Sequence, residues 1–289
     1  MRRDQLPPNP RHTFVLGRYK VVYVATPKAA CSSLKWVVAG IGGEDLTAFR
    51  AVDGTPSAGT GSIHARRLWK QVPRLHELTD DELAEIHAAN GWHVFAVVRH
   101  PATRLWSAWQ QKVLLCAPHR ELKVPVDRLP APPLTTADLV EAFADFVVDL
   151  ADGRFERLTD DLHFQSQHHV LAAERMPYTR VYTVAELDQA MRDLDAQVRA
   201  HGGGPVPALP SSNETPLKAL RSLFAPETLA TIREIYADDY RAWFSHDEGV
   251  PSGTRDEPEF SSAVLGEVRR LMEENARLRD GARDGVPAR

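Results

Sequence analysis

Two nearly continuous apolar segments of the chain, Tyr19 to Ala25 and His93 to Val98, predict buried strands. Arg180 to Val184 is expected to form a third, short strand. Continuous apolar character is typical of parallel strands that are covered on both faces. Segments with helical periodicity alternate with these strands, so the chain is predicted to be an α/β protein with a parallel sheet flanked by helices.

Most other apolar positions recur at helical spacing. The expected helices cover residues 32–41, 64–71, 79–89, 101–115, 136–150, 187–198 and 227–244. Residues 1–18 are expected to form a loose N-terminal arm, and the composition of residues 50–62 and 125–133 predicts loops. We therefore expect one main domain over residues 19–246 and a linker over 247–260.

A C-terminal helix is expected over residues 261–283. One seam of this helix has 4-3-4-3 spacing and contains Val264, Val268, Leu271, Asn275 and Leu278. An asparagine at such a position sets the register of parallel coiled coils, so the seam predicts self-association as a homodimer. Because the seam is only about two heptads long, the alternative is one amphipathic helix that packs on its own domain.

Composition narrows the class of protein. Of 289 residues, 43% are hydrophobic and 26% are charged, which is typical of a globular chain with a large core. A net charge of -4 argues against a general nucleic-acid-binding protein but allows a small basic pocket for an anion. We expect no membrane span and no signal peptide, and the two cysteines, Cys31 and Cys116, favour a reducing cytoplasm.

The first chemical motif joins a predicted strand to a helix through TPKAACSSLK, residues 26–35. Small residues let the backbone curl around an anion, and N–H groups at a helix start favour negative charge. Lys28 adds a positive charge, while Ser32 and Ser33 add hydroxyl donors. The glycines of the Walker pattern are absent, which disfavours an ordinary ATPase. The alternative is that Ser32 only caps the helix and Lys28 is solvated.

The second motif is VVRHPATRLWSAW, residues 97–109. Arg99 follows a predicted strand at its carboxyl end, where open α/β sheets bind ligands. Ser107 lies about two turns into the next helix, so a guanidinium and a hydroxyl can bind one phosphate. The alternative is that Arg99 pairs with a local carboxylate and Ser107 is a surface serine.

Together the two motifs resemble the cofactor signatures of the sulfotransferases that use 3′-phosphoadenosine 5′-phosphosulfate (PAPS). PKAACSSLKW is similar to the 5′-phosphosulfate loop of the branch that contains Golgi carbohydrate sulfotransferases and their bacterial relatives, and VRHPATRLWSAWQQK is similar to its 3′-phosphate signature. Weaker similarities follow at residues 161–167, where Phe164 replaces a tryptophan, and at residues 234–240. The resemblance covers about residues 19–246 and implies the sulfotransferase fold.

The resemblance also implies roles for individual residues. Those assigned to the 5′-phosphosulfate are Lys28, Ala29, Ala30, Cys31, Ser32 and Ser33. Arg99 and Ser107 are assigned to the 3′-phosphate. Lys28 would also neutralise the leaving oxygen, so the transfer requires no metal. The implied activity moves a sulfuryl group from PAPS to a hydroxyl of a carbohydrate or a glycosylated small metabolite.

An acceptor hydroxyl also needs a general base, for which histidine is the natural candidate near neutral pH. We prefer His64, which follows a flexible loop and lies between the two signatures, where relatives that act on uronyl sugars carry their histidine base. His163 is the second candidate, because its similarity to the family motif also fits a substrate-binding or structural role. For either residue the alternative is an ordinary surface or core histidine.

Two further groups of residues are given structural interpretations. Arg66, Arg67, Lys70 and Arg74 could grip an acidic acceptor, but a solvated helix face is preferred. The spacing of His163, His168 and His169 lacks the HExxH geometry, so no metal site is expected.

Two other functions stay open at this point. One is a nucleotide-dependent kinase with an atypical phosphate loop, which the missing Walker glycines disfavour. The other is a non-catalytic assembly protein that binds PAP, the desulfated product of PAPS, and the presence of Lys28, Arg99 and Ser107 disfavours it. The acceptor pocket is expected in the loops around residues 44–75 and 116–135.

Overall fold

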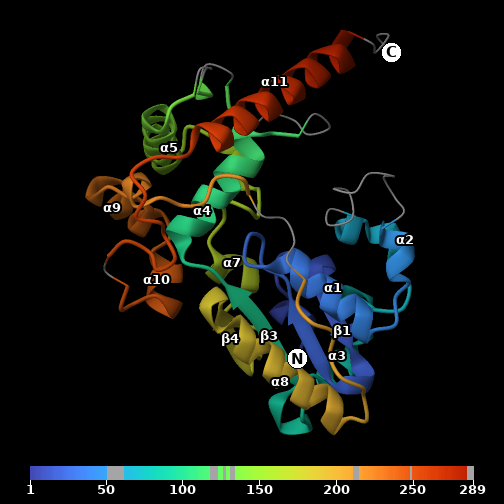
Figure 1. Ribbon diagram of the computed structural model, residues 1–289. Helices are drawn as coiled ribbons and strands as arrows, with labels where there is room; N and C mark the ends of the chain where they lie inside the picture. The colour runs from blue at the N-terminus through green and yellow to red at the C-terminus, as the bar shows by residue number, and fades with distance from the viewer. Residues whose placement is uncertain are drawn as a thin grey trace. The chain divides into compact units, whose positions relative to one another are not determined.

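The computed structural model describes residues 1–50, 62–117, 123–125, 128–130, 134–210, 215–247 and 249–284, with side chains through residue 280. The chain forms two compact units (Figure 1). The first comprises Met1–Arg99 and Gln167–Glu214, and the second comprises His100–Ser166 and Thr215–Arg289.

A four-stranded sheet of order β1-β2-β3-β4 forms the first unit. Its strands are β1 (Thr13–Leu16), β2 (Val21–Val24), β3 (His93–Val98) and β4 (Arg180–Thr183). The last three strands run parallel, with Tyr23 opposite Phe95 and Val97 opposite Tyr182. The predicted α/β class and its three parallel strands are therefore confirmed.

The loose N-terminal arm predicted over residues 1–18 is wrong. All four residues of β1 are buried, and the strand pairs antiparallel with β2, so that Phe14 lies opposite Tyr23. The amino group of Met1 also donates to the carbonyls of Leu83 and Ile86, at 2.7 and 3.2 Å. A run of four strand residues is too short to be read from periodicity alone, and it is stabilised here by pairing with its neighbour.

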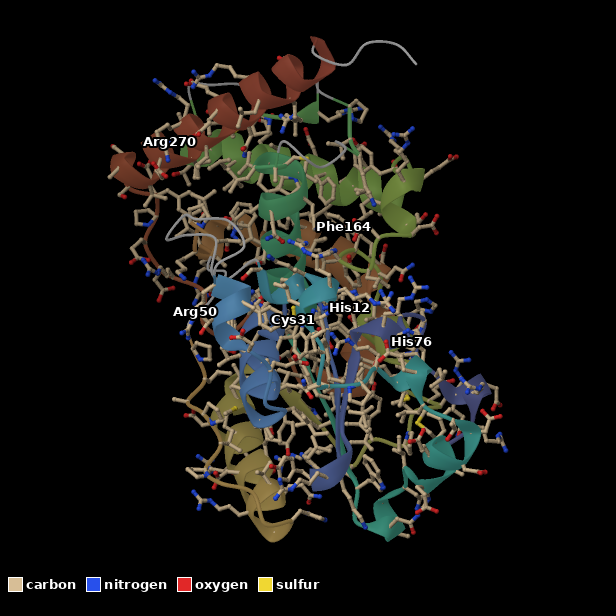
Figure 2. The ribbon with its side chains drawn as sticks, turned by 90° about the vertical axis from the view of Figure 1, so that its right-hand side faces the viewer. His12, Cys31, Arg50, His76, Phe164 and Arg270 are labelled. Carbon is tan, nitrogen blue, oxygen red and sulfur yellow. The ribbon has the colours of Figure 1, made fainter. Side chains whose placement is uncertain are left out.

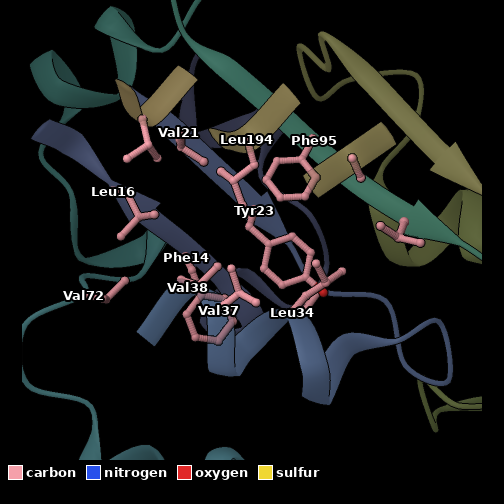
Figure 3. Close-up of a cluster of buried hydrophobic side chains, with 14 of the residues drawn as sticks. Phe14, Leu16, Val21, Tyr23, Leu34, Val37, Val38, Val72, Phe95 and Leu194 are labelled. Carbon is pink, nitrogen blue, oxygen red and sulfur yellow. The ribbon is translucent and has the colours of Figure 1, made fainter. Parts of the chain in front are cut away.

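Helices α1 and α8 supply the apolar layer on one face of this sheet. The helices of the first unit are α1 (Cys31–Ile41), α2 (Leu46–Arg50), α3 (Asp80–Glu85), α7 (Gln167–Leu171) and α8 (Leu187–Ala200). Figure 3 shows Leu34 and Val37 of α1 beside Phe14 and Tyr23 of the sheet, and Leu194 of α8 belongs to the same buried cluster. Because α1 packs on the sheet through these residues, the start of α1 has a fixed position relative to the end of β2.

The helix predicted over residues 64–71 is also wrong. Ser62–His64 and Arg66–Leu68 are separate single 3₁₀ turns. The carboxylate of Glu44 accepts hydrogen bonds from the backbone N–H groups of Lys70, Gln71 and Val72 at 2.8–2.9 Å. Those N–H groups bond a side chain from another segment instead of helix carbonyls, so no continuous helix forms.

Other predicted helices are shorter or broken. The helix expected over 79–89 ends at Glu85 and is followed by a 3₁₀ turn, Ala88–Asn90. The helix expected over 227–244 divides into α9 (Pro226–Ile235) and α10 (Ala237–Trp243). Tyr236 separates the two with φ of -115° and donates its hydroxyl to the carbonyl of Phe164 at 2.7 Å. Much of the loops expected over 50–62 and 125–133 lies outside the described residues.

The second unit is helical and contains an aromatic core. Its helices are α4 (Pro101–Trp109) with a π turn over Gln110–Leu114, α5 (Thr136–Ala151), α6 (Glu156–Thr159), α9, α10 and α11 (Ser262–Asp284). Trp106 and Trp109 stack on each other with ring centroids 5.2 Å apart, and both contact Phe143 edge-on. The tryptophans of the second motif are therefore core residues.

The C-terminal helix α11 packs partly on its own unit. Val268 is fully buried, and the side-chain amide of Asn275 donates to the carbonyl of Leu115. The asparagine of the predicted seam thus has an intramolecular partner, whereas Leu278 is exposed. A homodimer through this helix stays a prediction. Within the described ranges, no helix combines the length and apolar character needed to cross a membrane.

Candidate functional site

The loop between β2 and α1 has a backbone shape suited to an anion. Two of its residues, Lys28 and Ala30, adopt the left-handed region, with φ of 68° and 57°. Residues other than glycine rarely do so, and each costs on the order of 1–3 kcal/mol. Turns of this kind direct backbone N–H groups into a concave site that attracts anions. Strain of this kind clusters at binding sites, which marks this loop as a candidate.

The start of α1 completes this site. The helix begins at Cys31, with Ala30 as its N-cap residue. The first N–H groups of a helix have no acceptor within the helix, and the helix dipole is positive there. Cys31 is partly exposed, whereas Ala29, Ser32 and Ser33 are buried. We refer to residues 26–33 as the anion cradle.

His64, the preferred base, reaches the anion cradle. Its Nε2 atom lies 2.8 Å from Ser32 Oγ, although the two residues are 32 positions apart in the sequence. The side chain of Ser32 is buried, while His64 is exposed in the 3₁₀ turn that precedes Ala65. The structure therefore brings together two residues that were selected separately from the sequence.

Lys35 and His12 extend this contact and were not singled out by their sequence pattern. Lys35 Nζ lies 3.1 Å from His64 Nδ1 and 3.3 Å from His12 Nδ1. Lys35 is only 2% exposed, and its ammonium lies over the ring of Phe14, 5.5 Å from the centroid. Burial lowers the pKa of Lys35. A lysine within the apolar residues of α1 was the available signal, because a lysine is almost never fully buried without a partner.

Arg99 lies next to the cradle because β2 and β3 are parallel neighbours. The two strands end at the same edge of the sheet, and Arg99 directly follows β3. Its Nη1 atom donates to the carbonyl of Lys28 at 3.4 Å. The two cationic residues predicted to bind opposite ends of the donor thus belong to one edge of the first unit.

Gln167 holds the backbone of Arg99 in place. The Arg99 N–H donates to Gln167 Oε1, and Gln167 Nε2 donates to the Arg99 carbonyl, both at 2.8 Å. Gln167 is fully buried at the start of α7. The weak family similarity at residues 161–167 contained this glutamine, but only the structure assigns it a positioning role.

The predicted residues of the second unit are Ser107 and His163. Ser107 lies in α4 and is only 4% exposed, so the alternative that it is a surface serine is wrong. Arg104, one turn earlier, is fully buried and donates to the carbonyls of Leu162 and Gln165, both at 2.8 Å. Arg104 therefore fixes the backbone on both sides of His163.

His163 is oriented by a carboxylate. Its Nδ1 atom lies 2.6 Å from Asp161 Oδ1, and Lys123 Nζ lies 2.9 Å from Asp161 Oδ2. Burial alone would raise the pKa of Asp161, but its hydrogen bond to His163 and the Lys123 ion pair hold that pKa well below the usual range. An ionised Asp161 accepts the Nδ1–H of His163, which leaves Nε2 able to take a proton.

The basic residues that follow His64 do not form one solvated helix face. Arg66, Arg67 and Lys70 are exposed, but Arg74 is 4% exposed. Its guanidinium lies 3.9 Å from the ring centroid of Phe14 and 4.3 Å from that of Trp69. Burial lowers the pKa of Arg74 to about 10. Arg74 is therefore a buried core residue. Neither of the two interpretations from the sequence, a residue that binds an acidic acceptor or part of a solvated helix face, fits it.

A cavity of about 370 Å³ lies within the second unit, whereas the residues of the anion cradle belong to the first. Four carboxylates line it on one face of α5, Asp138, Glu141, Asp145 and Asp149, together with Arg128, whose guanidinium lies 3.5 Å from Asp149. Because like charges repel, this acidic wall disfavours a phosphate or sulfate ligand. The cavity is therefore not a candidate for the donor site.

The histidines near residue 165 were also considered as metal ligands. His168 and His169 lie on α7, and His168 Nε2 lies 3.9 Å from Glu174. Among the residues that the structure describes, no group of three or more His, Cys, Asp or Glu side chains could hold a metal ion.

The first unit has the features of a P-loop-like α/β protein: a strained strand-to-helix loop, a lysine in that loop and an arginine after the neighbouring parallel strand. A family model described as the Sulfotransferase family matches residues 11–244. The match covers most of the chain, so this protein belongs to the sulfotransferase family and is a transferase. Comparisons with curated proteins and with solved structures gave no match.

Proposed function

We propose that this protein transfers a sulfuryl group from PAPS to a hydroxyl of a carbohydrate or a glycosylated small metabolite. The observation that carries this proposal is the anion cradle with Arg99 beside it. Lys28 and Arg99 supply two cations at one sheet edge, and the strained loop and helix start supply backbone donors. PAPS carries anionic groups at both its 5′ and 3′ positions, which this arrangement suits.

The residues of the cradle fit the donor. Lys28, the backbone of residues 29–33 and the Ser32 and Ser33 hydroxyls would hold the 5′-phosphosulfate, and Arg99 would hold the 3′-phosphate. Ser107 stays a sequence-based prediction for the same phosphate. When bound, PAPS supplies an activated sulfuryl group. A binding site built from backbone N–H groups, hydroxyls and two fixed cations provides the electrostatic complement that such a leaving group needs.

The protein's own residues would promote transfer by positioning and charge. Sulfuryl transfer resembles phosphoryl transfer in that negative charge develops on the leaving oxygen. Lys28, a compact point charge in the cradle, would stabilise that charge. His64 would hold the proton of the acceptor hydroxyl at an imidazole nitrogen.

Binding measurements separate this proposal from the two alternatives. PAP should raise the melting temperature, whereas ATP with Mg²⁺ should not. Stabilisation by ATP with Mg²⁺ alone would favour the kinase. A screen of carbohydrate and glycosylated acceptors with labelled PAPS then tests turnover, and PAP binding without any transfer would favour a non-catalytic assembly protein. The reducing cytoplasm and the acceptor loops around 44–75 and 116–135 remain predictions, and parts of those loops lie outside the described residues.

Replacing Arg99 with alanine is expected to weaken PAP binding strongly. Loss of a charge-assisted phosphate contact costs about 1.5–3 kcal/mol, roughly a 10- to 150-fold rise in Kd. Isothermal calorimetry measures this change, with Arg192→Ala, an exposed arginine on α8, as the control. Equal PAP affinity in the wild type and in Arg99→Ala would remove Arg99 from the 3′-phosphate site.

Gln167→Ala should weaken PAP binding less than Arg99→Ala, because it removes only the support of Arg99. Two hydrogen bonds to the Arg99 backbone are lost, and leaving buried backbone groups unpaired costs about 1–3 kcal/mol of stability. Chemical denaturation and calorimetry measure both effects, with Gln189→Ala on α8 as the control. An unchanged unfolding free energy would contradict the proposed clamp.

A further inference from the structure

A chain of side chains connects His12 to the anion cradle. Lys35 Nζ contacts the Nδ1 atoms of His12 and His64, and His64 Nε2 contacts Ser32 Oγ. Figure 2 labels His12, at one end of this chain, and Cys31, which directly precedes Ser32 at the other end. In this chain of contacts, Lys35 is joined to the cradle through His64.

The protonation state of Lys35 limits which nitrogen of His64 can carry hydrogen. An ammonium has only donors, so a charged Lys35 requires a lone pair at His64 Nδ1. A neutral His64 then carries its hydrogen on Nε2 and donates it toward Ser32 Oγ. An uncharged Lys35 has one lone pair and can instead accept Nδ1–H, which leaves Nε2 with the lone pair that a general base needs.

We propose that Lys35 is a positioning residue that sets the tautomer of His64 and takes up a proton from it during transfer. The proposal rests on the proposed function, because it assigns the support of the same base. In the reactive state, Lys35 is an amine and His64 carries hydrogen on Nδ1. As the acceptor O–H proton moves to Nε2, the Nδ1 proton moves to Nζ, so that His64 ends neutral and Lys35 ends as an ammonium.

The surroundings of Lys35 favour its amine form more than water does. Burial in α1 lowers the pKa of Lys35, the Cys31 side chain one turn earlier raises it, and the Arg74 guanidinium lowers it further. The imidazoles of His12 and His64 are the other titratable groups in contact with Nζ, and Phe14 contributes only a ring face. Because the balance is toward a lower pKa, the His64 base form is present above the Lys35 pKa and is lost as pH falls through it.

Nitrogen NMR of the histidine side chains tests the tautomer directly, without substrate. In the wild type, the His64 ring hydrogen should move from Nε2 to Nδ1 as pH rises, and Lys35→Met should abolish this change. Lys20→Met, the same substitution at the lysine that directly precedes β2, should behave as the wild type. His64→Ala identifies the His64 signals. A single His64 tautomer across the pH range, or an unchanged switch in Lys35→Met, would overturn the proposal.

Kinetics provides the second readout. Lys35→Met should lower kcat/KM by about 10- to 100-fold, the usual effect of removing a group that orients a reactive histidine, and should shift its acidic limb to lower pH. Lys35→Arg, which cannot lose its proton, should be inactive at every pH. If Lys35→Arg retains activity, or Lys35→Met loses PAP affinity with an unchanged pH profile, Lys35 is a donor-binding charge instead. If the wild type transfers no sulfuryl group, the proposed function fails while the NMR result still decides the tautomer.

Discussion

Replacing His64 with alanine is expected to lower kcat by about 10²–10⁴-fold, the usual contribution of a positioned general base. The imidazole contacts Ser32 Oγ at 2.8 Å, at the edge of the anion cradle, and His64 is exposed to solvent. PAP affinity should change little, because the cradle backbone and Lys28 remain. The acidic limb of the pH–rate profile should disappear in the variant, since a base acts only when it is unprotonated.

His163→Ala is the matched comparison for this result. Asp161 orients His163 in the tautomer that leaves Nε2 basic, so the structure gives His163 the geometry of a base in its own unit. Steady-state kinetics and PAP calorimetry on both variants decide between them. If His163→Ala abolishes turnover with unchanged PAP affinity, and His64→Ala stays near the wild type, then His163 is the base and His64 is an acceptor-side residue.

Lys28→Ala is expected to reduce kcat by about 10²–10³-fold, the range for loss of one electrostatic group that acts on developing charge. The effect on PAP affinity should be smaller, because the charge on the leaving oxygen is greatest in the transition state. Lys28→Arg should restore only part of the activity, since a planar fork replaces a point charge. Single-turnover kinetics with labelled PAPS measures the chemical step.

Lys20→Ala is a suitable control for the backbone. Lys20 also adopts a left-handed conformation, with φ of 51°, so its replacement makes the same change of residue type at the same kind of position. It should leave kcat unchanged. If Lys28→Ala retained kcat and lost only PAP affinity, Lys28 would be a binding residue without a catalytic role.

The sequence alone predicted the strands whose apolar pattern is continuous. Residues 94–98 of β3 are apolar and buried throughout, and this pattern is visible without a structure. β1 was missed because its four residues follow a polar, proline-containing stretch and become a strand only by pairing with β2. The turns around Arg66 were missed because the Glu44 carboxylate, 26 positions earlier than Lys70, takes the N–H groups that a helix would use.

The sequence predicted those parts of the candidate site whose residues belong to short, continuous motifs. Lys28 and Arg99 follow strands that end at one edge, and parallel pairing brings them together as that pattern implies. Lys35, His12 and Gln167 were missed because their roles depend on contacts between distant positions. The Lys35–His64 pair spans 29 residues, and the Arg99–Gln167 pair spans 68.

The two hydrogen bonds between the Gln167 side chain and the Arg99 backbone also join the ends of a long segment that lies outside the first unit. The chain leaves the first unit after Arg99 and re-enters it at Gln167, so the two residues that bracket the excursion over 100–166 are hydrogen-bonded to each other. The position of the cation beside the cradle therefore depends on Gln167, a residue that the chain reaches only after it has passed through the whole excursion.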